Sequence, residues 1–112
     1  KKMLKRFIKY LTDISYPSKE QSQKERWDIK GRVLKSNQLF KFDVRSLVQS
    51  GDRLEKIGFF DTKANKTVFE TQDQWIIFDT EELNSYLKIN NIIDVPLQGL
   101  LKNLNWNQII NK

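Results

Sequence analysis

Residues 45–61 read RSLVQSGDRLEKIGFFD, and this stretch decides the fold that the sequence predicts. Its first part is polar and closes as a loop at Gly51, where glycine suits a backbone with positive φ. Residues 54–60 then predict a strand. Gly58 lies in the middle of that strand, where a glycine usually marks a bulge or the close approach of another backbone. We expect this strand to be the third of a small sheet.

Alternation of apolar and polar residues predicts the other strands of the sheet. Residues 27–35 and 39–44 come before residues 54–60 along the chain. A fourth strand follows at residues 67–70 or 74–78. In a strand, alternate residues share a face, so we expect Lys30 and Arg32 to lie together, and likewise Lys41 and Asp43.

Two short helices are predicted after the strands. Asp79 or Thr80 caps the first helix, and Glu82 completes a capping-box pattern. Asp94 caps the second helix, whose apolar stripe contains Leu97, Leu100, Leu101 and Leu104.

The first 26 residues have a different pattern. Residues 1–16 have the apolar spacing of an amphipathic helix that Pro17 ends, and residues 18–26 are polar without periodicity. We therefore expect residues 1–26 to form a basic N-terminal extension and residues 27–112 to form one domain. The predicted fold is α+β: a mainly antiparallel four-stranded sheet covered by two short C-terminal helices, with an N-terminal basic helical extension.

Composition restricts the function. The 112 residues include no Cys and no His, which excludes thiol nucleophiles, imidazole bases and zinc ribbons. The net charge is +6. Residues 1–36 carry 11 Lys and Arg against 4 Asp and Glu, and the remaining residues carry 9 against 10. This asymmetry favours an anionic partner met by the N-terminal third, with a solvated basic tail as the alternative.

No combination of residues predicts catalysis. Glu81 and Glu82 are adjacent at a helix start, where the helix dipole favours negative charge and adjacent side chains point apart. Asp43, Asp73 and Asp79 are too scattered for a metal site. We therefore expect no enzyme activity, no cofactor, no metal and no small-molecule substrate.

Basic residues are the better candidates, because Lys and Arg bind phosphate oxygens. The predicted RNA-binding residues of the sheet and its turns are Lys30, Arg32, Lys35, Lys41, Arg45, Arg53 and Lys56. Those of the extension are Lys2, Lys5, Arg6 and Lys9. The alternative is an ordinary solvated face. Three tryptophans could stack on bases, but core packing is the preferred interpretation.

The order of loop, strand and helices resembles a known family. Leu54, Glu55, Lys56, Ile57, Gly58, Phe59 and Phe60 resemble the middle strand of the bacterial-type ribosomal small-subunit protein S-sixteen family, with Asp61 in place of its Asn. Residues 83–102 are similar to the family's helix, loop and helix, so the resemblance covers about residues 27–104. It implies a structural constituent of the ribosomal small subunit that binds small-subunit rRNA and neighbouring ribosomal proteins.

The resemblance also singles out residues. It implies that Arg32 and Lys35 of the first strand and Arg45 of the loop lie against rRNA. The hairpin after the first strand is shortened to residues 35–38, and a basic N-terminal region is added. Together with the Lys-, Asn- and Ile-rich composition, these departures favour a divergent mitochondrial version, located in the matrix on the ribosome. Another organelle or a bacterial cytoplasm is the alternative location.

A second class of function stays open. Residues 1–14 could lie in an anionic membrane interface with Leu4, Phe7, Ile8 and Leu11 buried. The chain would then be a basic amphipathic membrane-surface or protein-interaction module. The ribosomal interpretation predicts no membrane partner.

Overall fold

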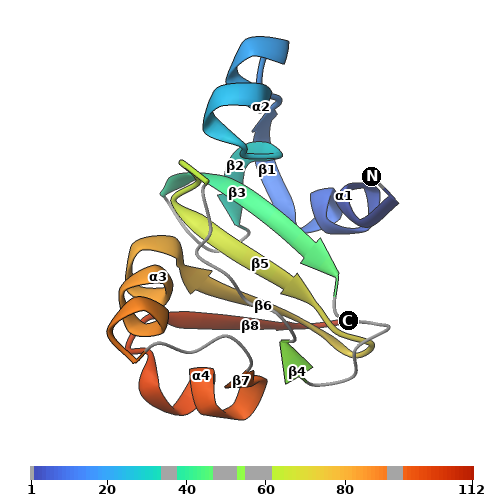
Figure 1. Ribbon diagram of the computed structural model, residues 1–112. Helices are drawn as coiled ribbons and strands as arrows, with labels where there is room; N and C mark the ends of the chain where they lie inside the picture. Colours follow the sequence, from blue (N-terminus) through green and yellow to red (C-terminus); the bar gives the residue numbers. More distant parts are fainter. Residues whose placement is uncertain (1, 34–37, 47–52, 55–61, 91–94) are drawn as a thin grey trace.

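The computed structural model describes residues 2–33, 38–46, 53–54, 62–90 and 95–112, and it shows a strongly curled half-barrel sheet with short helices interspersed (Figure 1). Side chains are described for residues 4–33, 38–45, 62–90 and 99–112. The elements are α1 (Lys2–Phe7), a 3-10 turn η1 (Ile8–Tyr10), β1 (Leu11–Ser15), α2 (Lys19–Glu25), β2 (Ile29–Val33), β3 (Leu39–Ser46), β4 (Arg53–Leu54), β5 (Lys66–Glu70), β6 (Gln74–Asp79), α3 (Thr80–Ile89), β7 (Val95–Pro96), α4 (Leu97–Asn103) and β8 (Asn107–Asn111).

The main sheet has six strands in the order β1-β2-β3-β5-β6-β8. All neighbouring pairs are antiparallel except β3 and β5, which are parallel. A parallel pair needs a crossover connection, and the chain between β3 and β5 provides it. Within that connection, β4 forms a separate two-stranded pair with β7.

The strand registers define two faces of the sheet. Ile29, Phe42, Val68 and Ile77 belong to the face on which α1 packs, here called the α1 face. Lys30, Asp43, Phe69 and Ile76 belong to the other face, here called the α3 face.

The α1 face carries an apolar cluster that reaches all six strands. Phe7 of α1 is fully buried, and its ring lies 5.5 Å from that of Phe42 and 5.1 Å from that of Trp75, centroid to centroid. The cluster includes buried residues of β1, β2, β3, β5 and β6, and partly buried Ile110 of β8 packs against it. The N-terminal helix therefore forms part of the main core.

The α3 face has an apolar part and a charged part. Over β5 and β6, Phe69, Ile76 and Phe78 pack against α3 and α4 through Leu83, Leu87, Leu100 and Leu104. Over β2 and β3, the same face carries charged side chains instead. The candidate site lies where this face changes from apolar to charged side chains.

The predicted fold is wrong, although the protein is α+β. The sheet has six strands and is mixed, whereas four strands in a mainly antiparallel sheet were expected. Residues 67–70 and 74–78, offered as alternatives for one strand, belong to two strands, β5 and β6. Of the predicted third strand, residues 54–60, only Leu54 is described, in β4, which lies outside the main sheet; Gly58 and the other residues of that strand lie outside the described residues.

The predicted N-terminal helical extension is also wrong. The helix ends at η1, and residues 11–15 form an edge strand of the sheet. Asp13 has φ of 55°, and the register shifts between Thr12 and Ser15, so β1 lacks regular alternation. The expected boundary at residues 26 and 27 falls between α2 and β2.

The segment that was expected to be a linker contains a helix. Ser18 caps α2 by accepting a hydrogen bond from the Gln21 backbone N–H at 3.1 Å, and the Gln21 side chain accepts one from the Ser18 backbone N–H at 3.0 Å. This reciprocal pair is a capping box. Arg26 ends the helix with φ of 59°, in the left-handed region.

Candidate nucleic-acid interface

Four cationic side chains lie on the charged part of the α3 face. They are Lys30 and Arg32 of β2 and Lys41 and Arg45 of β3, here called the basic strip. Lys30 and Lys41 are directly opposite each other in the antiparallel register. Side chains opposite each other in such a pair have Cβ atoms about 5 Å apart, and like charges there are destabilising by roughly 0.2–1 kcal/mol.

Carboxylates hold three of the four cations. Arg32 Nε lies 3.0 Å from Asp13 Oδ2, Lys41 Nζ lies 3.1 Å from Glu25 Oε1, and Arg45 Nη2 lies 3.0 Å from Asp43 Oδ2. Among the described residues, Lys30 is in no ion pair. These pairs orient the strip and reduce its net charge.

The strip joins the sheet to the end of α2. Glu25 accepts hydrogen bonds from Lys41 Nζ and, at 3.1 Å, from Trp27 Nε1. These two donors hold the pKa of Glu25 below its ordinary value. Lys41 Nζ also lies 5.3 Å from the centroid of the Trp27 ring, within the range of a cation–π contact. The Lys41 ammonium is therefore fixed from two sides.

A pocket of about 320 Å³ opens beside Arg45. Asp28 and Asp43 lie in its wall, and Asp28 Oδ2 accepts a hydrogen bond from the Val44 backbone N–H at 2.8 Å. Burial raises the pKa of Asp43, the Arg45 guanidinium lowers it, and the neighbouring Asp28 raises it, so that it lies above its ordinary value. The other lining residues are Ser22, Arg26, Trp27 and Thr62.

The structure brings together only part of the predicted set. Lys30, Arg32, Lys41 and Arg45 share a face, which confirms the expectation that Lys30 and Arg32 lie together. Lys35 and Lys56 lie outside the described residues, and only the backbone of Arg53 is described, in β4.

The basic residues of the N-terminal segment lie apart from the strip, because α1 packs on the opposite face of the sheet (Figure 1). Arg6 is paired with Glu70 at 2.7 Å. Lys5 and Lys9 are exposed, and Lys9 Nζ lies 5.3 Å from the centroid of the Tyr10 ring. Of Lys2, only the backbone is described. Lys5, Arg6 and Lys9 are therefore not part of one surface with Lys30.

The three tryptophans contribute to packing. Trp27 and Trp75 are buried, and Trp106 is partly buried against the α1-face cluster. Lys66 Nζ lies 3.7 Å from the centroid of the Trp106 ring and 2.8 Å from Asp79 Oδ1. The preferred interpretation of the tryptophans as packing residues is confirmed.

Sequence reasoning missed the residues that organise the strip. Asp13 and Glu25 were assigned to an extension, yet both pair with strip cations. The Ser18–Gln21 capping pattern could have revealed the helix that carries Glu25.

In the described part of the chain, no group of three or more acidic side chains could hold a metal ion, and no helix there is long and apolar enough to span a membrane.

Comparison with known proteins adds no assignment. No protein-family model matches the chain, and it matches no curated protein and no solved structure. The functional argument therefore rests on the basic strip and its surroundings.

Proposed function

We propose that this protein is a non-catalytic RNA-binding component of a ribonucleoprotein and that it contacts structured RNA through the basic strip. The observation that carries the proposal is the direct opposition of the partly exposed Lys30 and Lys41 on one sheet face. Such an arrangement costs folding free energy, which phosphate binding would offset. The net charge of +6 also favours the binding of RNA phosphates.

The carboxylates beside the strip shape this recognition. An RNA phosphate reaching Arg32, Lys41 or Arg45 must compete with Asp13, Glu25 or Asp43. Lys30 has no such competitor among the described residues and is the expected point of first contact. Phosphate and 2′-hydroxyl contacts of this kind recognise the shape of an RNA more than its sequence.

Fluorescence anisotropy with a labelled RNA hairpin, repeated over a series of salt concentrations, tests the proposal. If the basic strip neutralises a few RNA phosphates, the slope of log K against log salt should lie between about −2 and −4. A slope near zero, or no binding at low salt, would contradict it.

The narrower proposal is that this RNA is small-subunit rRNA, in a mitochondrial ribosome, with neighbouring ribosomal proteins as further partners. Its support is the resemblance of residues 27–104 to the S-sixteen family; the six-stranded fold is not the one that this resemblance implied. Sedimentation in high salt tests it separately. The chain should migrate with the small subunit, and its release into the light fractions would remove the ribosomal proposal while leaving RNA binding open.

The membrane-surface alternative meets a structural obstacle. Phe7 and Leu11 are buried in the core, and Leu4 and Ile8 pack against it. Inserting these side chains in a bilayer would require α1 to leave the sheet. RNA binding needs no such opening.

A further inference from the structure

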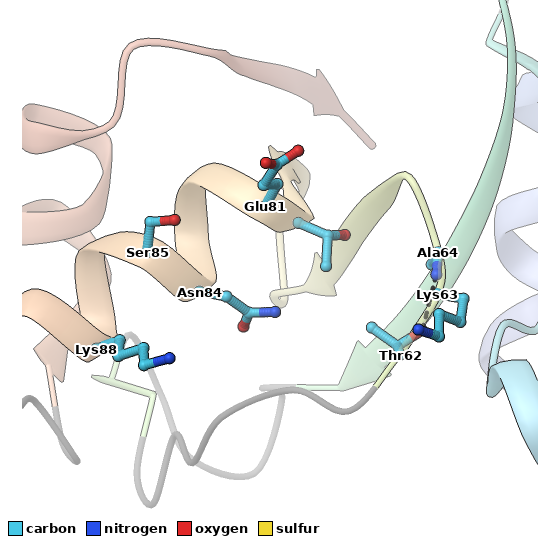
Figure 2. A pocket seen from close by; sticks show the side chains of 8 residues that line it. Thr62, Lys63, Ala64, Glu81, Asn84, Ser85 and Lys88 are labelled. Carbon is cyan, nitrogen blue, oxygen red and sulfur yellow. Dashed lines mark hydrogen bonds between the residues drawn. The ribbon is translucent and has the colours of Figure 1, made fainter.

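A second pocket, separate from the basic strip, lies between residues 62–64 and one side of α3 (Figure 2). Its volume is about 720 Å³, within the range of small-molecule sites. The lining residues are Thr62, Lys63, Ala64, Thr80, Glu81, Asn84, Ser85 and Lys88.

The α3 wall is built from one face of the helix. Thr80, Asn84 and Lys88 follow each other at intervals of four residues, which places them one above another on a helix. The helix is anchored at its start, because Asp79 Oδ2 accepts a hydrogen bond from the Glu82 backbone N–H at 3.1 Å. Leu83 and Leu87 anchor its other side in the core. This wall is therefore in place before any ligand binds.

The opposite wall is held as firmly. The Lys63 backbone N–H donates to the Glu25 carbonyl at 2.6 Å, and Thr62 Oγ1 donates to the Arg26 carbonyl at 3.0 Å. The Ala64 backbone N–H in turn donates to Thr62 Oγ1 at 3.1 Å. These bonds fix residues 62–64 to the end of α2.

Two ammonium groups approach the pocket from the two walls. Figure 2 shows Lys88 and Asn84 extending from α3 toward the segment that carries Thr62 and Lys63. Both lysines are exposed, and within the described part of the chain neither has an ion-pair partner. The Lys63 charge also helps to lower the pKa of Glu25, so it acts on that carboxylate as well as on the pocket. Two exposed cations facing one space favour a compact group with two negative charges. Glu81 and Ser85 offer hydrogen-bonding groups for a polar remainder of the ligand, whereas the Thr80 hydroxyl already shares a buried hydrogen bond with Thr67 Oγ1 at 2.8 Å.

We propose that this pocket binds a phosphate monoester whose organic part carries hydroxyl groups. A phosphate monoester is close to dianionic at pH 7, and lysines bind it as point charges. The ester phosphate lies between Lys63 and Lys88, and the Glu81 carboxylate accepts hydrogen bonds from hydroxyl groups. The group can come from a free sugar phosphate or from the 5′ end of an RNA. The proposal does not depend on binding at the basic strip, which is a different set of residues.

Calorimetric titration of the whole chain with ribose 5-phosphate, inorganic phosphate and ribose tests the proposal. Ribose 5-phosphate should bind at least about tenfold more tightly than ribose, since the charge–charge contacts are absent from ribose. The substitutions Lys63→Gln and Lys88→Gln should each weaken the binding of ribose 5-phosphate at least about tenfold. Lys102→Gln, an exposed change on α4, is the matched control and should leave binding unchanged. Circular dichroism confirms that each variant is folded.

Two RNA probes identify the source of the phosphate. Oligonucleotides of one sequence with a 5′-phosphate or a 5′-hydroxyl are compared by anisotropy in the wild type and in Lys88→Gln. A preference for the 5′-phosphate that Lys88→Gln removes supports the RNA end as the ligand. Binding of ribose 5-phosphate without that preference supports a free sugar phosphate.

Three results would overturn the site. These are equal affinity for ribose and ribose 5-phosphate, binding of ribose 5-phosphate that survives both lysine substitutions, and no binding of either phosphorylated probe. The ribose 5-phosphate titrations can be interpreted even if the RNA hairpin does not bind at the basic strip. The two proposals are therefore tested independently.

Discussion

Arg6 and Glu70 form a two-point ion pair, with Nε 2.7 Å from Oε2 and Nη2 2.7 Å from Oε1. Arg6 belongs to α1 and Glu70 ends β5, so the pair joins the N-terminal helix to the centre of the sheet. Lys112 Nζ, at 3.0 Å from Oε2, adds the C-terminus to the same carboxylate. Only 1% of the Glu70 side chain is exposed, so this negative charge depends on its two partners.

Glu70→Gln should lower the free energy of unfolding by about 1–2 kcal/mol. The amide NH2 of Gln would face a donor where a carboxylate oxygen now accepts, and half-exposed Arg6 retains some solvation, which limits the loss. Glu20→Gln is the matched control, because the Glu20–Lys24 pair is largely exposed, and its effect should stay within about 0.5 kcal/mol. Urea denaturation measures both. Equal effects would show that burial adds nothing to the Glu70 contacts.

Glu70 also predicts a pH dependence. The hydrogen bonds from Arg6 hold the pKa of Glu70 below its ordinary value of 4.5, against the opposing effect of burial. As pH falls below that value, the unfolded chain takes up the proton before the native state does, so stability decreases. Asp79 acts in the same direction: burial raises its pKa, but the hydrogen bonds from Lys66 and the Glu82 N–H outweigh this and lower it.

The variant isolates the contribution of Glu70. Stability of the wild type should fall more steeply than that of Glu70→Gln between about pH 5 and about pH 3. Midpoints of urea denaturation at several pH values give the two curves. Parallel curves over this range would mean that the pKa of Glu70 is the same in both states.

Phe7→Ala should destabilise the protein by about 3–5 kcal/mol, because it empties the centre of the α1-face core. Ile89→Ala is the control, since Ile89 is 82% exposed and its truncation should change little. Deleting residues 1–16 should abolish cooperative thermal unfolding, since β1 and Phe7 are lost together. A folded, cooperatively melting truncation would show that the remaining strands suffice.

Gly31→Ala should weaken the attachment of β1. A Cβ at Gly31 would lie 3.1 Å from the Thr12 carbonyl oxygen and 3.4 Å from Leu11 Cβ, so β1 must move away. The expected cost is about 1–2 kcal/mol. Hydrogen exchange should accelerate for β1 amides more than for β5 amides. Unchanged protection in β1 would show that the edge strand absorbs the added methyl group.

Regular alternation was the part of the fold that the sequence predicted well. The alternation of Ile29 and Val33 with Lys30 and Arg32 predicted β2 within residues 27–35, and the side-chain period of two placed Lys30 and Arg32 on one face. Arg45 was assigned to the loop after the second strand, whereas β3 extends to Ser46 and includes it. The Asp79 cap was also placed correctly, and Leu100, Leu101 and Leu104 pack in one cluster as their spacing predicted. The last helix begins at Leu97, after β7, and the predicted cap Asp94 lies outside the described residues. These features depend on neighbours close in the sequence.

The missed features depend on distant contacts. Leu11 and Ile14 continue the helical spacing of α1, and the positive φ of Asp13 interrupts the alternation that would mark a strand. β8 is a short polar segment whose pairing with β6 decides its conformation. Arg6 was predicted to bind RNA, yet its partner Glu70 lies 64 residues away along the chain. A residue's charge shows what it can bind, but the fold decides whether that capacity is already used.

The most direct test of RNA binding through the basic strip compares Lys30→Glu with Lys102→Glu, which change the net charge equally. Both side chains are solvent-accessible, and Lys102 lies on α4, outside the strip. Anisotropy with the same RNA hairpin should show at least about tenfold weaker binding for Lys30→Glu and a salt slope flatter by about one unit. Lys102→Glu should stay within about threefold of the wild type, as expected for long-range charge alone. If the two variants weaken binding equally, or if Lys30→Glu binds like the wild type, the strip is not the RNA-binding surface.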